Sequence, residues 1–235
     1  MEGPKIIFTI PLLGGIPVTE MVVNSWFIIL AVFIACRLIT RRLQKVPSGV
    51  QVLAEKYVTM VCKLVDDTMG KNKQRYAPYI GTVFLFSALG SLISLLGCRA
   101  VTADLNTTLS WALVTFVMTQ WGGIRTKGLL SWLKGFLDPV PVMLPMNIMS
   151  ELVNPISLSF RHFGNISAGM VITTMIYSGL AALTNIVFQG LLPVPIFQLG
   201  LPAILSIYFD VFSGVLQAFI FCMLTMVFVG MATDP

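Results

Sequence analysis

Charged side chains are scarce in this sequence. Only 11% of its 235 residues are Asp, Glu, Lys or Arg, whereas a soluble domain carries about 25%. Hydrophobic residues make up 56% of the chain, and the mean hydropathy is +0.88. This balance excludes a soluble globular domain and indicates an integral membrane protein that crosses the bilayer several times.

Metal-binding, disulfide and phosphate-binding patterns are also lacking. The four cysteines, Cys36, Cys62, Cys98 and Cys222, are scattered without a CxxC pair, so we predict neither a metal site nor disulfides. No GxxxxGK(S/T) loop is present, so we expect no nucleotide site, no cofactor and no catalytic centre in this chain. No internal repeat or import signal is evident, and we interpret 1–235 as a single membrane domain.

Apolar runs long enough to cross a bilayer occur along the whole chain. The predicted membrane helices are 22–39, 79–96, 105–120, 156–189 and 202–232. Each of the last two would be about 45 to 50 Å long at 1.5 Å per residue, too long to stand upright in a hydrocarbon core about 30 Å thick. We therefore predict an all-α integral membrane protein with about five membrane crossings, ending in a hairpin of two long tilted helices.

Lysine and arginine are concentrated on one side of this predicted topology. The residues on that side are Arg37, Arg41, Arg42, Lys45, Lys56, Lys63, Lys71, Lys73, Arg75, Arg125, Lys127 and Lys134. Only Lys5 and Arg99 fall on the opposite side. The positive-inside rule then places the N-terminus outside and the C-terminus in the cytoplasm. The net charge of +5 is thus a topology signal, and we expect no nucleic-acid partner.

The basic segment between the first two spans contains an amphipathic helix, predicted for 48–70. Val50, Leu53, Tyr57, Val61 and Val65 recur at helical spacing, and charged residues interrupt the run. We predict that this helix lies along the inner membrane surface or against partner subunits.

Arg161 is the most informative residue, because it lies within the predicted span 156–189. A guanidinium does not lose its proton, and one at mid-bilayer costs about 3 kcal/mol on insertion scales. Snorkelling or an ion pair inside the bundle would explain it structurally, but no acid follows within helical reach on the same helix. We predict a counter-ion on another subunit. His162 lies about 100° further round the helix, and we interpret it as a packing or interface residue, with a proton relay as the alternative.

Polar residues form a stripe on each of the two long predicted helices. The stripes are Asn154, Ser157, Arg161 and Asn165 on the first helix, and Ser206, Asp210, Ser213 and Gln217 on the second. Interhelical hydrogen bonding would account for the uncharged members, whereas a carboxylate such as Asp210 inside a span is typical of an ion pathway. Glu151 precedes the first stripe, either as a helix cap or at the mouth of an inner aqueous path.

Three segments, in this order, resemble subunit a of the F-type ATP synthases, the membrane stator beside the rotor ring. They are Thr102-Ala-Asp-Leu-Asn-Thr-Thr-Leu-Ser110, Ser157-Leu-Ser-Phe-Arg-His-Phe-Gly-Asn165 and Leu216-Gln-Ala-Phe-Ile-Phe221, and the resemblance covers nearly the whole chain. It implies that Arg161 faces the carboxylates of the c-subunit ring, with Asn165 and Gln217 near it in the ion path. It also implies that Asp104 and Asn106 lie towards an outer access channel and that Glu151 lies near an inner one.

The chain departs from this family at two positions. Many bacterial members carry a glutamate nine residues after the arginine, where this chain has Met170, and a histidine seven before the glutamine, where it has Asp210. We therefore expect the outer ionisable group to have moved to Asp210.

The resemblance implies a non-catalytic stator with two half-channels that carry H⁺ or Na⁺ to and from the c-ring carboxylates. The implied partners are the c-subunit ring, the peripheral-stalk b subunits, the remaining ATP synthase subunits and the lipid bilayer. We expect a bacterial cell (inner) membrane location, with an organellar energy-coupling membrane as the alternative. The alternative function is a secondary ion-coupled transporter with Arg161 as substrate ligand, which would favour two related halves with broken helices.

Overall fold

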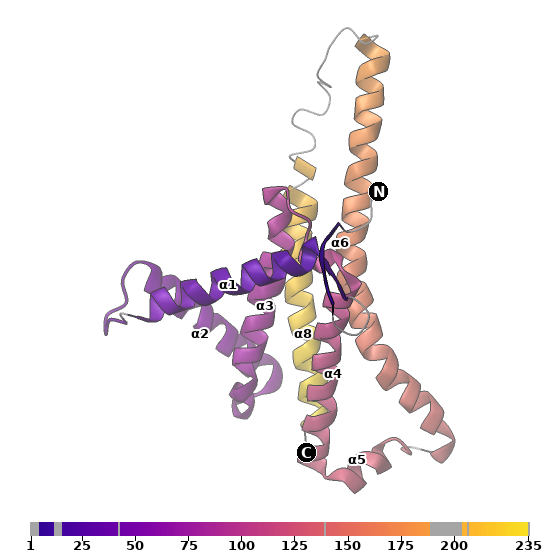
Figure 1. Cartoon of the computed structure of the whole chain (residues 1–235). Coiled ribbons are helices and arrows are strands. Elements are labelled where there is room, and N and C mark those ends of the chain that lie inside the picture. Colours follow the sequence, from indigo (N-terminus) through magenta and orange to yellow (C-terminus); the bar gives the residue numbers. More distant parts are fainter. Residues whose placement is uncertain are drawn as a thin grey trace.

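Long helices running side by side form the body of the protein, and a small β-hairpin precedes them (Figure 1). The structure, a computed structural model, describes residues 5–11, 16–41, 43–138, 140–188, 204–205 and 207–234. In chain order its elements are β1 (Ile6–Ile10), β2 (Ile16–Thr19), α1 (Glu20–Thr40), α2 (Val50–Met69), η1 (Lys71–Tyr76), α3 (Ala77–Leu92), η2 (Ile93–Leu96), η3 (Val101–Ala103), α4 (Leu105–Lys127), α5 (Leu129–Gly135), η4 (Pro141–Met143), α6 (Leu144–Phe188), the π-helical η6 (Ile207–Ser213) and α8 (Gly214–Ala232).

The helical bundle confirms the predicted all-α membrane fold. Among the described residues, four helical stretches are long and apolar enough to cross a membrane: Glu20–Thr40, Lys71–Leu96, Pro141–Val187 and Ile207–Ala232. The remaining predicted crossing, 105–120, lies in α4, which is less apolar because it carries many hydroxyl side chains. Thr108 meets Ser159 of α6 at 3.3 Å and Thr115 meets Thr225 of α8 at 3.4 Å, so these hydroxyls bond inside the bundle.

The antiparallel pair β1–β2 was not predicted from the sequence. Ile10 pairs with Ile16 and Ile6 with Thr19, with an irregularity between Ile6 and Phe8. β-branched and aromatic residues on both sides of Gly14 and Gly15 are a hairpin signal. The signal was missed because the bilayer-scale apolar runs dominate the pattern of this chain.

The long helix α6 begins earlier than the predicted 156–189. It extends from Leu144 for 45 residues, about 68 Å at 1.5 Å per residue, and contains Pro155 in its interior. Its N-terminal part bends away from the bundle (Figure 1), which is the usual effect of a proline inside a helix. Residues 190–202, where the turn of the terminal hairpin was predicted, lie outside the described residues.

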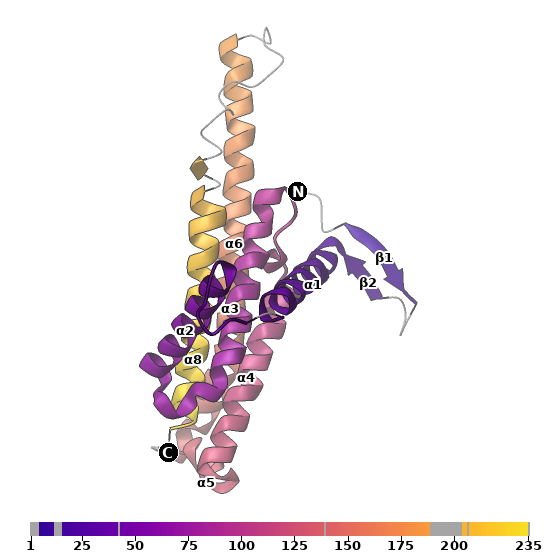
Figure 2. The same ribbon diagram turned by 90° about the vertical axis from the view of Figure 1, so that its left-hand side faces the viewer.

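The axis of α1 crosses those of α3, α4, α6 and α8 steeply in both views (Figures 1 and 2). With 21 residues, or about 31 Å, α1 matches the hydrocarbon thickness without tilting. If α1 stands upright, α6 and α8 must lie obliquely in the bilayer. The tilt predicted for the two long helices stays a prediction.

Helix α2 lies within the predicted segment 48–70, and its apolar face is partly buried and partly exposed. Val61 and Val65 are buried against α3 and α8 in the main core cluster, whereas Val50 and Leu53 are exposed. The Tyr57 hydroxyl donates to the Gly81 carbonyl at 2.6 Å, and burial raises the pKa of this phenol to about 12. The phenol therefore stays neutral and continues to donate at physiological pH. This bond joins α2 to α3 beside the membrane bundle.

Candidate functional site

Arg161 lies on an open face of α6. Ser157 and Asn165, one turn on either side, are exposed with it, while Leu158 and Ser159 are buried in the bundle. Among the described residues Arg161 forms no ion pair, so the alternative of an ion pair within the bundle has no support there. The arginine is presented outward, where another molecule can reach it.

One hydrogen bond joins the two polar stripes. The Asn165 amide on α6 donates to the Ser213 hydroxyl at the end of η6 at 2.7 Å. Gly214 follows directly, and a Cβ at its position would lie 2.8 Å from the Ser91 side chain of α3. This close approach, directly after the π-helical η6, brings the start of α8 against both α3 and α6. Local π-helical segments occur frequently at functional sites.

The remaining members of the second stripe are placed differently. Asp210 is half-buried on η6, and Gln217 is buried with its amide nitrogen unpartnered among the described residues. Ser206 lies outside the described residues. Where the structure describes it, this stripe thus contains a half-buried acid and a buried amide.

His162 turns away from the Arg161 face into the bundle. It is fully buried, its Nε2 lies 3.2 Å from the Ser87 hydroxyl, and its ring makes edge contacts with Trp111 and Phe221. These contacts favour the packing interpretation over a proton relay.

A large cavity of about 520 Å³ lies at the end of the bundle where α4, α5, α6 and α8 meet. Glu151, on α6, lines it and accepts a 2.8 Å hydrogen bond from the Gln120 amide of α4. Its other polar lining residues are Thr115, Thr119, Lys127, Ser131, Asp138, Asn147, Ser150 and Asn154. The sequence had indicated Glu151 but not Gln120, because an amide within an otherwise apolar helix gives no sign of its partner.

A smaller cavity of about 150 Å³ lies against Arg161. Its lining includes Asn154, Ser157, Leu158 and Arg161. Asn154, Leu158 and Phe228 line both cavities, so the two are neighbours. Polar groups therefore lead from Glu151 past Asn154 to the arginine.

Asp104 and Asn106 lie at the opposite end of α4 from Gln120. The Asp104 carboxylate caps α4, accepting from the Asn106 backbone N–H at 3.1 Å and from the Thr107 hydroxyl at 3.3 Å. From Asp104 to Gln120 the helix rises about 24 Å at 1.5 Å per residue. The residues predicted for the outer and inner paths are thus well separated along the bundle.

Met170 lies in an apolar cluster. It packs against Met21, Ala100 and Ala103. This environment fits a packing side chain.

A bundle with an outward-facing arginine inside a membrane-spanning helix, flanked by polar cavities, defines the class of polytopic membrane proteins that carry charged groups at membrane depth. Comparison with known proteins shows which family within that class. Residues 22–230 match the ATP synthase A chain family, and the chain belongs to that family. It is therefore a multi-pass membrane protein of the F0 sector of F-type ATP synthases.

Individual relatives align with this chain over most of their lengths. The chain is 33% identical to the ATP synthase subunit a, sodium ion specific, of Propionigenium modestum, over 97% of this chain and 84% of the relative. It is 34% identical to ATP synthase subunit a of Moorella thermoacetica, over 93% and 92%. With ATP synthase subunit a 1 of Syntrophotalea carbinolica it shares 35% identity over 91% and 85%. Family membership favours a stator over a secondary transporter.

Proposed function

We propose that this chain is the ion-translocating stator of a rotary ATP synthase, with two offset half-channels that load and unload carboxylates on a rotating ring of c subunits. The observation that carries the proposal is the exposed guanidinium of Arg161 inside a membrane-spanning helix, which has no ion-pair partner among the described residues. Such a charge needs a carboxylate from outside the described residues, and a passing ring of acidic side chains supplies one repeatedly.

The inner half-channel is the pair of cavities between Glu151 and Arg161. A cation released by the ring at Arg161 passes Asn154, which borders both cavities, and reaches the larger cavity beside Glu151. The Gln120 amide orients the Glu151 carboxylate towards that route. Asp138, on the same lining, adds a second carboxylate at the exit.

The outer half-channel runs past Asp104 and Asn106 to Asp210 and Gln217. The hydrogen bond between Asn165 and Ser213 joins the two long helices beside Arg161. Arg161 separates the two routes, because its fixed charge repels a cation and draws the ring carboxylate into its ion-free, deprotonated form. The driving force is about 2.3 kcal/mol per charge per 100 mV, and ATP is formed on partner subunits.

The coupling ion is H⁺ or Na⁺. The name of the Propionigenium modestum relative specifies sodium, while the half-buried Asp210 and the polar lining of the cavities suit either ion. The N-terminus faces outward and the C-terminus faces the cytoplasm of a bacterial cell membrane, with the peripheral-stalk b subunits beside the exposed part of α2.

Thiol labelling tests the outer path. Cysteines introduced at Asp210, Ser213 or Gln217 in the assembled complex are expected to react with small water-soluble thiol reagents, because these positions share the polar stripe. Cysteines at Ile207 or Phe212, which are exposed apolar positions on other faces, should face lipid or protein and stay unreactive. Equal labelling on all faces would show that the stripe is packing contact and not an aqueous path.

A substitution at Glu151 tests the inner path. Glu151→Gln should slow ATP-driven ion pumping by about fivefold to tenfold at limiting inner ion concentration, because the cavity loses a charge that concentrates cations. Gln120→Leu should produce a smaller defect of the same kind by releasing the carboxylate from its hydrogen bond. Asp67→Asn, an exposed carboxylate of α2, is the matched control and should leave pumping unchanged. Unchanged dependence on inner ion in Glu151→Gln would remove Glu151 from the path.

A further inference from the structure

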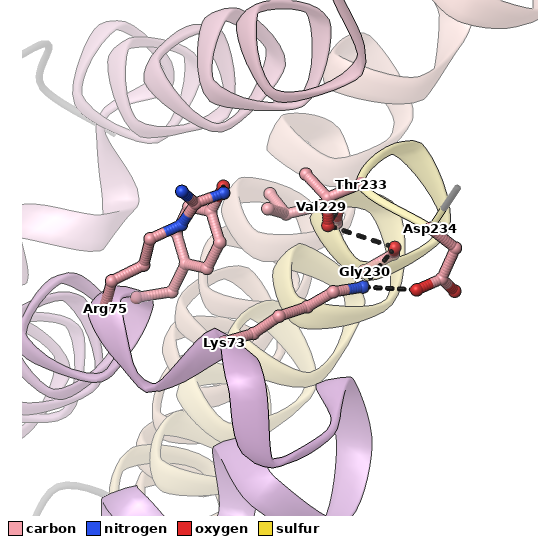
Figure 3. Close-up of polar contacts among 7 residues, drawn as sticks. Lys73, Arg75, Val229, Gly230, Thr233 and Asp234 are labelled. Atoms are coloured by element: carbon pink, nitrogen blue, oxygen red, sulfur yellow. Dashed lines mark hydrogen bonds and ion pairs between the residues drawn. The ribbon is translucent and has the colours of Figure 1, made fainter. Parts of the chain in front are cut away.

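The end of α8 is held by a side chain from a distant part of the sequence. Lys73 reaches from η1 to the last turn of α8, where its ammonium donates to the Gly230 carbonyl at 2.9 Å and pairs with the Asp234 carboxylate (Figure 3). Only 14% of the Lys73 side chain is exposed. The neighbouring Arg75 turns away and lies over the Tyr76 ring instead.

The Lys73 contact supplies a positive charge that the last turn of α8 lacks. The last turn of α8 contains no basic residue of its own, although the carbonyls at the end of a helix favour a nearby cation. Lys73 provides that cation and binds one of those carbonyls directly. The contact therefore fixes where α8 ends relative to η1.

Gly122, which has no side chain, leaves a notch in α4 that holds the same end of α8 from the other side. A Cβ at Gly122 would lie 2.6 Å from the Thr233 methyl group and 3.6 Å from the Tyr76 hydroxyl. The Thr233 hydroxyl donates to the Val229 carbonyl at 2.7 Å, which locks the side chain in this position. The end of α8 is thus seated between η1 and α4.

The seated part of α8 is also a wall of the larger cavity. Phe228, Met231 and Ala232 line it, together with Glu151 of α6 and Gly123 of α4. We propose that Lys73 is a positioning residue: by clamping the end of α8, it sets the shape of the inner cavity through which the ion enters or leaves. The contact of Lys73 with the end of α8 is given by the geometry alone. Its effect on ions rests on the proposed function.

Cross-linking measures the seating without reference to ion flow. In the assembled complex, Met69→Cys with Gly230→Cys should form a disulfide on mild oxidation, because a Cβ at Gly230, at the end of α8, would lie 3.7 Å from the Met69 side chain of α2. Adding Lys73→Met should lower the cross-linking rate by about fivefold, the change expected from losing one partly buried charge contact. Lys71→Met, on the same η1 but exposed, is the matched control and should have no effect. Lys73→Arg should restore most of the rate. An unchanged rate in Lys73→Met overturns the clamp.

Ion dependence then tests the positioning role. In the otherwise natural complex, Lys73→Met should raise the inner ion concentration that half-saturates ATP-driven pumping by about fivefold, with a smaller change in the maximal rate. The outer ion dependence of ATP synthesis should stay as it is. A slower cross-link with unaltered inner ion dependence would overturn the positioning role and leave the proposed stator function, which is tested at Arg161 and Glu151, untouched.

Gly122 offers a second route to the same conclusion. Gly122→Ala should displace Thr233 and reproduce the Lys73→Met defect, because the new methyl group would overlap the Thr233 methyl. Thr233→Ser removes that methyl but keeps the hydroxyl bonds to the α8 carbonyls, so the double variant should recover. If Gly122→Ala prevents assembly, the readout is recovery of assembly in the double variant. Failure of the serine to restore either property contradicts the notch.

Discussion

Replacing Arg161 by alanine is expected to abolish ion-driven ATP synthesis while the complex still assembles. A unit charge about 4 Å from a carboxylate contributes about 4 kcal/mol at an effective dielectric constant near 20. Loss of that term shifts the ion occupancy of the carboxylate by about a thousandfold, so the ring would no longer unload at the stator. Synthesis in inverted membrane vesicles, measured against an imposed ion gradient, should fall to background.

Assembly should survive because Arg161 makes no ion pair among the described residues and lies on an exposed face. Copurification of the c subunit with the variant checks this point. Arg161→Lys should be nearly as damaging, since a compact ammonium lacks the planar fork of the guanidinium. Phe160→Ala, at the exposed neighbouring position, is the control and should retain most synthesis. Substantial synthesis by Arg161→Ala would rule out the stator mechanism.

Helical periodicity was sufficient to group the polar residues of the two long helices into stripes. The Asn165–Ser213 hydrogen bond joins one member of each stripe. The same spacing predicted that His162 leaves the face of Arg161, and His162 is fully buried in the bundle. Periodicity succeeds here because one side chain's direction on a helix fixes the directions of all the others.

Features that depend on distant partners could not be predicted in this way. The Gln120–Glu151 bond and the Lys73 contact with α8 each join elements whose juxtaposition no local pattern encodes. The start of α6 was placed too late because Pro155 usually marks a helix start, whereas this helix continues through it. In both cases tertiary packing decides what the local sequence leaves open.

Removing the charge of Asp210 is expected to slow ion uptake from the outside. Asp210→Asn should lower ATP synthesis by about tenfold at limiting outer ion concentration, because a carboxylate at the entrance raises the local cation concentration. At saturating outer ion the rate should approach that of the unaltered complex. Passive leakage should stay low, since Arg161 still separates the two half-channels.

Met170→Ala provides the contrast, because it changes the position at which the family places a glutamate. Met170 packs against Met21, Ala100 and Ala103, so its truncation should cost packing and leave the outer ion dependence as it was. Met170→Glu combined with Asp210→Asn goes further: if the ionisable role moved between these positions, the double variant should regain part of the lost rate at limiting ion. Synthesis measured against outer ion concentration decides between the two residues, and an unchanged curve for Asp210→Asn would assign the entrance charge elsewhere.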